Sequence, residues 1–187
     1  MSLDVPFLAV IALALALDRS GAAAVGLACA AIHEAAHIAA MRALGEFPQE
    51  MRFTAFGIDL VRRGEKRGYL RDALVSLAGP AANLVAAGLC YAVFQRKYEL
   101  FLVMNLLLFG LNILPIAPLD GGQAMRALLC RRLAPETADR AVAAVSFFAL
   151  VPLAAAGFFV LLRSRGNFTL LAAAGYLTAL LLMKRER

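Results

Sequence analysis

The chain has 187 residues, of which 62% are hydrophobic, and its mean hydropathy is +0.75. The apolar residues fall in long runs that leave no room for a soluble domain of useful size, so the composition predicts an all-α polytopic membrane protein. The net charge of +6 comes from Lys and Arg residues between the runs, without the interleaved aromatic residues of a nucleic-acid surface. We therefore expect the lipid bilayer, and no nucleic acid, as a partner.

Six apolar runs predict about six membrane-spanning helices in a single membrane-embedded domain over residues 1–187. The first run is short, and it lacks the basic leader of a signal peptide because Asp4 stands there. Small residues within the runs favour close helix packing. The predicted spans are Leu3–Leu17, Gly21–Leu44, Ala73–Phe94, Leu100–Ile116, Thr137–Leu162 and Phe168–Met183.

The second run contains His33-Glu34-Ala35-Ala36-His37, which holds both histidines of the chain. Residues four apart on a helix share a face, so His33 and His37 can bind one Zn²⁺ ion, with Glu34 beside it as the base for a water molecule. The alternative is a pair of core histidines satisfied by hydrogen bonds. Ionisable groups in an apolar helix are costly and indicate a function, so we predict one zinc ion per chain and Glu34 as the catalytic residue.

The segment Glu46–Asp72 separates the second and third runs and differs from both in being rich in Arg. Within it, Met51–Arg62 partly alternates apolar and polar residues, and Gly57 could mark a bend or bulge. This pattern favours a short membrane-associated β strand or hairpin, and a plain basic loop is equally compatible with it. A strand with an open edge could pair with an extended peptide.

The fourth run breaks at Asn112-Ile113-Leu114-Pro115-Ile116-Ala117-Pro118-Leu119-Asp120-Gly121-Gly122. The prolines end the helix, and the paired glycines are expected to allow a tight turn after Asp120. Irregular backbone at membrane depth must be buried in protein or line a wet cavity, and a carboxylate there needs a partner. A zinc ion held by two histidines lacks a third protein ligand, which Asp120 can supply. Alternatively, Asp120 caps a helix over Gln123–Leu133.

These motifs together resemble those of the site-2 proteases, a family of intramembrane zinc metalloproteases. A third motif, Ser76-x-Ala78-Gly79-Pro80-x-x-Asn83, lies between the other two in the expected order. The resemblance implies zinc ligation by His33, His37 and Asp120, with Glu34 catalytic. It also makes three residues candidates for positioning the substrate or the oxyanion, namely Asn83, Asn112 and Gly57.

The compact layout most resembles the stage IV sporulation protein FB branch of that family. Members of this branch often carry a CBS domain after the last helix, and we expect none here because the chain stops at Arg187. The resemblance implies regulated intramembrane proteolysis of a membrane-anchored protein substrate, with regulatory membrane proteins as further partners. The alternative is a zinc-binding transporter or sensor without protease activity, which would not require the base Glu34.

The distribution of positive charge predicts the orientation in the membrane. Fourteen of the 19 Lys and Arg residues lie in Arg42–Arg71, Arg126–Arg140 and the C-terminal tail, which six spans place on one side. The positive-inside rule then puts both termini in the cytoplasm of what we expect to be a bacterial cell, with the protein in its cytoplasmic membrane. The metal should lie within the membrane, nearer the cytoplasmic face.

Overall fold

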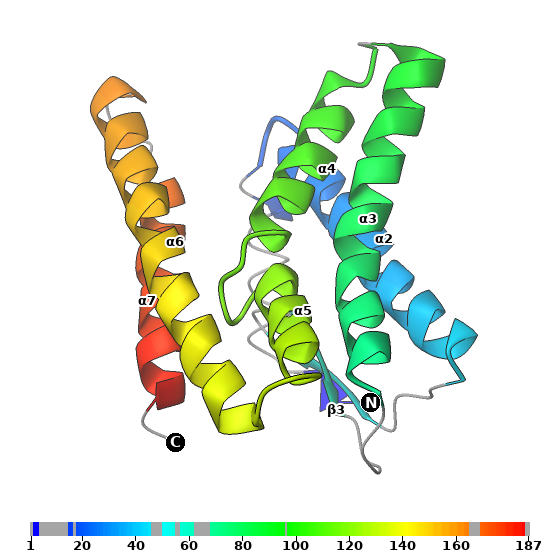
Figure 1. Cartoon of the computed structure of the whole chain (residues 1–187). Coiled ribbons are helices and arrows are strands. Elements are labelled where there is room, and N and C mark those ends of the chain that lie inside the picture. The colour runs from blue at the N-terminus through cyan, green and yellow to red at the C-terminus, as the bar shows by residue number, and fades with distance from the viewer. Residues whose placement is uncertain are drawn as a thin grey trace. The chain divides into compact units, whose positions relative to one another are not determined.

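The computed structural model describes residues 2–3, 15–16, 18–45, 50–54, 57–61, 68–95, 97–164 and 169–185. Helices dominate these residues, and the chain divides into two compact units, Met1–Gly110 and Leu111–Arg187. The named helices are α2 (Ala22–Ala43), α3 (Tyr69–Phe94), α4 (Glu99–Asn112), α5 (Asp120–Leu129), α6 (Pro135–Ser164) and α7 (Thr169–Arg185), and the strands are β1 (Ser2–Leu3), β2 (Glu50–Thr54) and β3 (Gly57–Val61) (Figure 1).

Three of the described helices are long and apolar enough to cross a membrane: α2, α3 and the Pro135–Arg163 part of α6. Helix α4 is apolar but has only 14 residues, whereas a helix needs about 20 residues to cross a bilayer. The predicted first span, Leu3–Leu17, lies almost entirely outside the described residues. The helical, membrane-embedded character is therefore supported, and the count of six spans stays a prediction.

A carboxylate caps the beginning of α2. Asp18 accepts hydrogen bonds from the Ser20 hydroxyl (2.6 Å) and from the backbone N–H groups of Ser20 (2.8 Å) and Ala23 (2.6 Å). These hydrogen bonds lower the pKa of Asp18 below its ordinary value, and the hydrogen bond from the Ser20 hydroxyl contributes most. Gly21 then enters the helix with a φ of 76°, a left-handed conformation that glycine adopts without strain.

In the first unit, α2 and α3 pack against each other through one narrow face of each helix. Residues four apart lie on the same face of a helix, and both helices bury side chains at this spacing. On α2 these are Cys29, His33, His37 and Met41, and on α3 they include Val75, Gly79, Asn83 and Ala87. Large apolar side chains elsewhere on α3, such as Leu74, Leu89 and Val93, are exposed, as a helix surrounded by lipid requires.

The strands form one sheet in the order β1-β2-β3. The ladder between β2 and β3 is antiparallel and regular, from the pair Glu50–Val61 to the pair Thr54–Gly57. Gly57 therefore stands at the end of the ladder, and no bulge interrupts the pairing between the two strands. Among the described strands β3 pairs with β2 alone, so one of its edges is left for another strand.

Helix α4 ends at Asn112, four residues before the end of the predicted run. Pro115 has no N–H group to donate to the carbonyl of Leu111, so the helix cannot continue through it. The N–H of Leu114 bonds the Leu111 carbonyl instead (3.2 Å), and a further turn joins the N–H of Leu119 to the carbonyl of Ile116 (2.8 Å). Helix α5 follows directly from Asp120.

Candidate metal centre

The hydrogen bonds of the two histidines fix which ring nitrogen carries the proton. His37 Nδ1 lies 2.8 Å from the carbonyl oxygen of Val75, which can only accept, so Nδ1 must donate. His33 Nδ1 lies 2.5 Å from Asn83 Oδ1. The Asn83 amide is oriented by its Nδ2, which donates to the carbonyl of Cys29 (3.2 Å), so its Oδ1 faces His33 as an acceptor.

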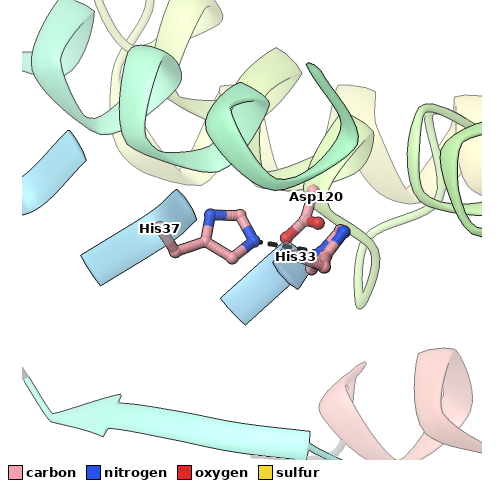
Figure 2. Close-up of side chains that lie close together, drawn as sticks. All are labelled: His33, His37 and Asp120. Atoms are coloured by element: carbon pink, nitrogen blue, oxygen red, sulfur yellow. Dashed lines mark hydrogen bonds between the residues drawn. The ribbon is translucent and has the colours of Figure 1, made fainter. Parts of the chain in front are cut away.

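With the proton on Nδ1, the neutral form of each ring carries its lone pair on Nε2, and these two atoms lie 3.1 Å apart (Figure 2). A hydrogen bond between them would require a second proton on one ring, which would make it a buried cation: His33 is 6% exposed and His37 is 7% exposed. A shared metal ion needs no such proton. Two nitrogens bound to one tetrahedral zinc ion are separated by roughly 3.3 Å, so the spacing fits zinc.

Gly79 of α3 lies directly against this pair. A Cβ atom at this position would lie 2.6 Å from His33 Nε2 and would also collide with His37 Nε2. Any side chain here would displace the rings or occupy the space beside their lone pairs. The close approach of α3 to α2 at Gly79 is thus a condition for the metal site.

Asp120 joins the two histidines in the group that could hold a metal ion. Among the residues that the structure describes, one candidate ligand atom from each of His33, His37 and Asp120 lies within 4.8 Å of the others (Figure 2). An imidazole–imidazole–carboxylate donor set is one that zinc accepts in catalytic sites.

The segment that precedes Asp120 is anchored by hydrogen bonds within its own unit. Ser146 of α6 is fully buried, and its hydroxyl accepts the N–H of Ala117 (2.8 Å) and donates to the carbonyl of Val142 (2.6 Å). Gly121 and Gly122 belong to α5 and do not form the expected turn. A Cβ on Gly121 would lie 2.6 Å from the Leu114 carbonyl oxygen, so the glycines are needed because the backbone of residues 113–117 passes directly over α5.

The other predicted site residues occupy varied places. Glu34 follows His33 on α2 and is partly buried. Asn112 is the last residue of α4 and is also partly buried, and Gly57 opens β3. Asn83 lies against His33, and both hydrogens of its Nδ2 are already donated, to Cys29 and to Asn105.

Two features of the centre were missed from the sequence. The Val75 carbonyl cannot be recognised there, because every residue has one. Asn105 had a visible signal, since it is a polar side chain in the middle of the apolar run Leu100–Ile116, and polar groups at membrane depth mark functional or packing contacts.

The chain is similar to known proteins in sequence and in fold. Residues 94–153 match Peptidase family M50. Rip3 of Mycobacterium tuberculosis, in strains Erdman and H37Rv, bears a name that describes a zinc metalloprotease, and it is 32% identical over 125 residues. That alignment covers 60% of this chain and 32% of Rip3, so the chain spans about a third of the length of the curated relative.

Among solved structures, the site-2 protease from Methanocaldococcus jannaschii aligns with a TM-score of 0.64 and 20% sequence identity. The alignment covers 92% of this chain and 83% of that one, and it shows the fold. The fold is thus similar to that of a site-2 protease, and the paired histidines lie on a helix of this fold. The segment that matches Peptidase family M50 is about a third of this chain, so the chain is similar to that family over residues 94–153. These similarities support the family and zinc predictions, whereas the stage IV sporulation protein FB branch stays a prediction.

Replacing Gly79 by Ala should abolish stoichiometric zinc binding, because the added methyl group collides with both Nε2 atoms. We also expect a loss of stability of about 1–3 kcal/mol from overpacking. Metal analysis and thermal unfolding of the purified protein would measure both effects. Gly88→Ala on the same helix is the matched control, because a Cβ there meets nothing within 4 Å. Full zinc content in Gly79→Ala would contradict the site geometry.

Proposed function

We propose that this protein is a zinc metalloendopeptidase that hydrolyses a peptide bond in or near a transmembrane segment of a membrane-anchored protein substrate. The observation that carries the proposal is the pair of buried Nε2 atoms 3.1 Å apart, on the helix that also bears Glu34. The match of residues 94–153 to Peptidase family M50 supports it. Regulated intramembrane proteolysis is the corresponding biological process.

His33, His37 and Asp120 are the proposed zinc ligands. The Nδ1–H tautomers of both rings, which place a lone pair on Nε2, and the proximity of the three ligand atoms support this set. The partly buried Asp120 is also the first residue of α5, where the positive end of the helix dipole favours an ionised carboxylate.

Glu34 is proposed as the general base and acid. Zinc, when bound, polarises the scissile carbonyl and lowers the pKa of a water molecule to about 7. The Glu34 carboxylate takes the proton of the attacking water and returns it to the leaving amine, so the proton is not lost to the apolar surroundings. A transporter or sensor would need the histidines but not this carboxylate.

Asn83 is proposed to orient His33 and not to bind the oxyanion. An oxyanion needs a hydrogen-bond donor, and both Asn83 N–H groups already have acceptors within the first unit. The resemblance leaves Asn112, at the end of α4, as a candidate for positioning the substrate.

The chain is proposed to be a multi-pass protein of a bacterial cytoplasmic membrane, with six spans, both termini in the cytoplasm and the active site toward that side. Three described helices of sufficient length and the concentration of Lys and Arg in alternate connections support this arrangement. Regulatory membrane proteins are proposed as further partners, by family resemblance.

The substrate is proposed to add as a strand to the membrane-associated sheet, at the edge of β3 that β2 does not cover. A helical substrate keeps its carbonyl groups in internal hydrogen bonds, so it must be extended before a peptide bond can be attacked. Pairing with an open strand edge would hold it extended. Since β2 lies between β1 and β3, its own edges are already used, and Gly57 at the start of β3 would then contact substrate backbone.

Glu34→Gln should reduce cleavage by about 10²–10⁴-fold, the usual contribution of a general base, while zinc stays bound. The assay would co-express the variant with single-pass membrane reporters that the wild-type chain cleaves. Glu136→Gln, an exposed change in the first turn of α6, is the control and should cleave normally. Near wild-type cleavage by Glu34→Gln would refute the assigned role.

Asp120→Ala should lower the zinc affinity by more than about 100-fold. Loss of a hydrogen-bond partner of a metal ligand costs up to about that factor, and this change removes a direct ligand. Titration of metal-free protein with zinc would give the affinity. Asp139→Ala is the control, since it removes a carboxylate of the same unit that pairs with Arg126. Equal zinc affinity in wild type and Asp120→Ala would exclude this ligand.

A substrate held at the β3 edge should cross-link to a cysteine placed in that strand. Ile58→Cys or Leu60→Cys would be combined with Glu34→Gln to trap a substrate that carries single cysteines near its cleavage site. The same substitutions in β2, at Met51 or Phe53, serve as controls because that strand is covered on both edges. Absence of cross-links from β3, or equal cross-linking from β2, would count against edge pairing.

A further inference from the structure

Asn105 of α4 is a fully buried polar residue that the proposed reaction does not use. Its Nδ2 donates to the carbonyl of Phe101 (2.9 Å) and to the sulfur of Cys29 (3.0 Å). Its Oδ1 accepts a hydrogen bond from Asn83 Nδ2 (2.8 Å). Every polar atom of this side chain therefore has a hydrogen-bond partner inside the first unit. One of these partners, Asn83, contacts His33.

These hydrogen bonds form a chain with one direction. His33 Nδ1 donates to Asn83, Asn83 donates to Asn105, and Asn105 donates to the carbonyl of Phe101. The carbonyl at the end can only accept. If the Asn105 amide were reversed, its oxygen would face the Phe101 carbonyl oxygen and its N–H group would face the N–H group of Asn83. Both contacts would be repulsive. The backbone carbonyl on α4 therefore fixes the orientation of Asn105, and through it that of Asn83 and His33.

The two histidines differ in the kind of acceptor that holds them. His37 donates to a backbone carbonyl, which belongs to α3 and cannot rotate. His33 donates to a side-chain amide, which can flip and present its N–H group instead. After such a flip, His33 Nδ1 would have to accept, and its Nε2 would carry the proton and could not bind a metal.

We propose that Asn105 is a positioning residue for His33: acting through Asn83, it keeps His33 in the tautomer that presents the Nε2 lone pair to zinc. The inference rests on the proposed zinc centre and adds to it a residue outside the recognised motifs. Asn83 is also held by the carbonyl of Cys29, so loss of Asn105 weakens this orientation without removing it.

The tautomers can be read directly, because the chain contains only two histidines and both are in the site. The full-length protein in detergent would be labelled with ¹⁵N-histidine and studied metal-free. In the wild type, both rings should give the Nδ1–H tautomer. In Asn105→Leu, the His33 signals should shift toward a tautomer mixture, while those of His37 stay unchanged as an internal reference.

Zinc titration of the same proteins gives a second measurement. Asn105→Leu should bind zinc about tenfold more weakly, at the lower end of the 10–100-fold that outer partners of metal ligands cost. Asn105→Asp should keep both properties in the protonated form that burial favours, because the neutral carboxyl group still accepts the Asn83 N–H and can donate its O–H to the Phe101 carbonyl. Cys90→Ala is the packing control: Cys90 is buried on the same α3 helix but contacts Tyr98 and not this chain of hydrogen bonds.

A wild-type His33 in the Nε2–H tautomer would overturn the proposal, and this measurement remains available if Asn105→Leu does not fold. Unchanged His33 signals and unchanged zinc affinity in Asn105→Leu would also overturn the proposal. Equal shifts of the signals of both histidines would do the same, because they would indicate a general loosening of the structure. Neither measurement requires peptide cleavage. Failure of the protease function would therefore leave this result standing, whereas a wild type that binds no zinc would refute the zinc centre itself.

Discussion

The centre depends on the short distance between α2 and α3. Both helices present a face on which buried residues recur every four positions, and on α3 Gly79 lies directly against the two histidine rings. Because Gly79 has no side chain, Val75 and Asn83, one turn away on either side, can reach His37 and His33. Helix packing here is therefore also the device that orients the metal ligands, since hydrogen bonding and close contact occur on one surface.

An apolar environment makes these hydrogen bonds directional and hard to replace. Water is scarce at membrane depth, so each buried polar group must find its partner within the protein. His37 meets this requirement through a backbone carbonyl, and His33 meets it through two asparagines that end at another carbonyl. The tautomers that place a lone pair on both Nε2 atoms thus follow from which backbone groups the helices bring into reach.

The local part of the site could be predicted from the sequence, because four-residue spacing on a helix brings His33 and His37 together without any tertiary information. Asp120 was inferred from a chemical requirement, the third ligand. The glycines after it were misread: Gly121 and Gly122 are helical, and they are glycines because backbone atoms lie where a Cβ would stand. Sequence alone cannot distinguish a glycine needed for a turn from one needed for contact.

Asn105 could not be assigned for a related reason. Its role is defined by the side chain that it meets on α3, and nothing in a single sequence pairs two asparagines 22 residues apart. The same limit applies to Ser146, which binds the backbone of Ala117 in the second unit. Residues that orient other residues can be identified only once the packing is known, whereas candidate metal ligands can be identified from their residue type and spacing.

The charges of the proposed site give a reason for its acidic residues. Two neutral imidazoles and one carboxylate leave a bound zinc ion with a net charge of about +1. An isolated charge is costly in apolar surroundings, and an ionised Glu34 beside the site would compensate for it. Transfer of a proton from water to Glu34 then moves charge within the site without changing its total, so the reaction avoids creating a new buried charge.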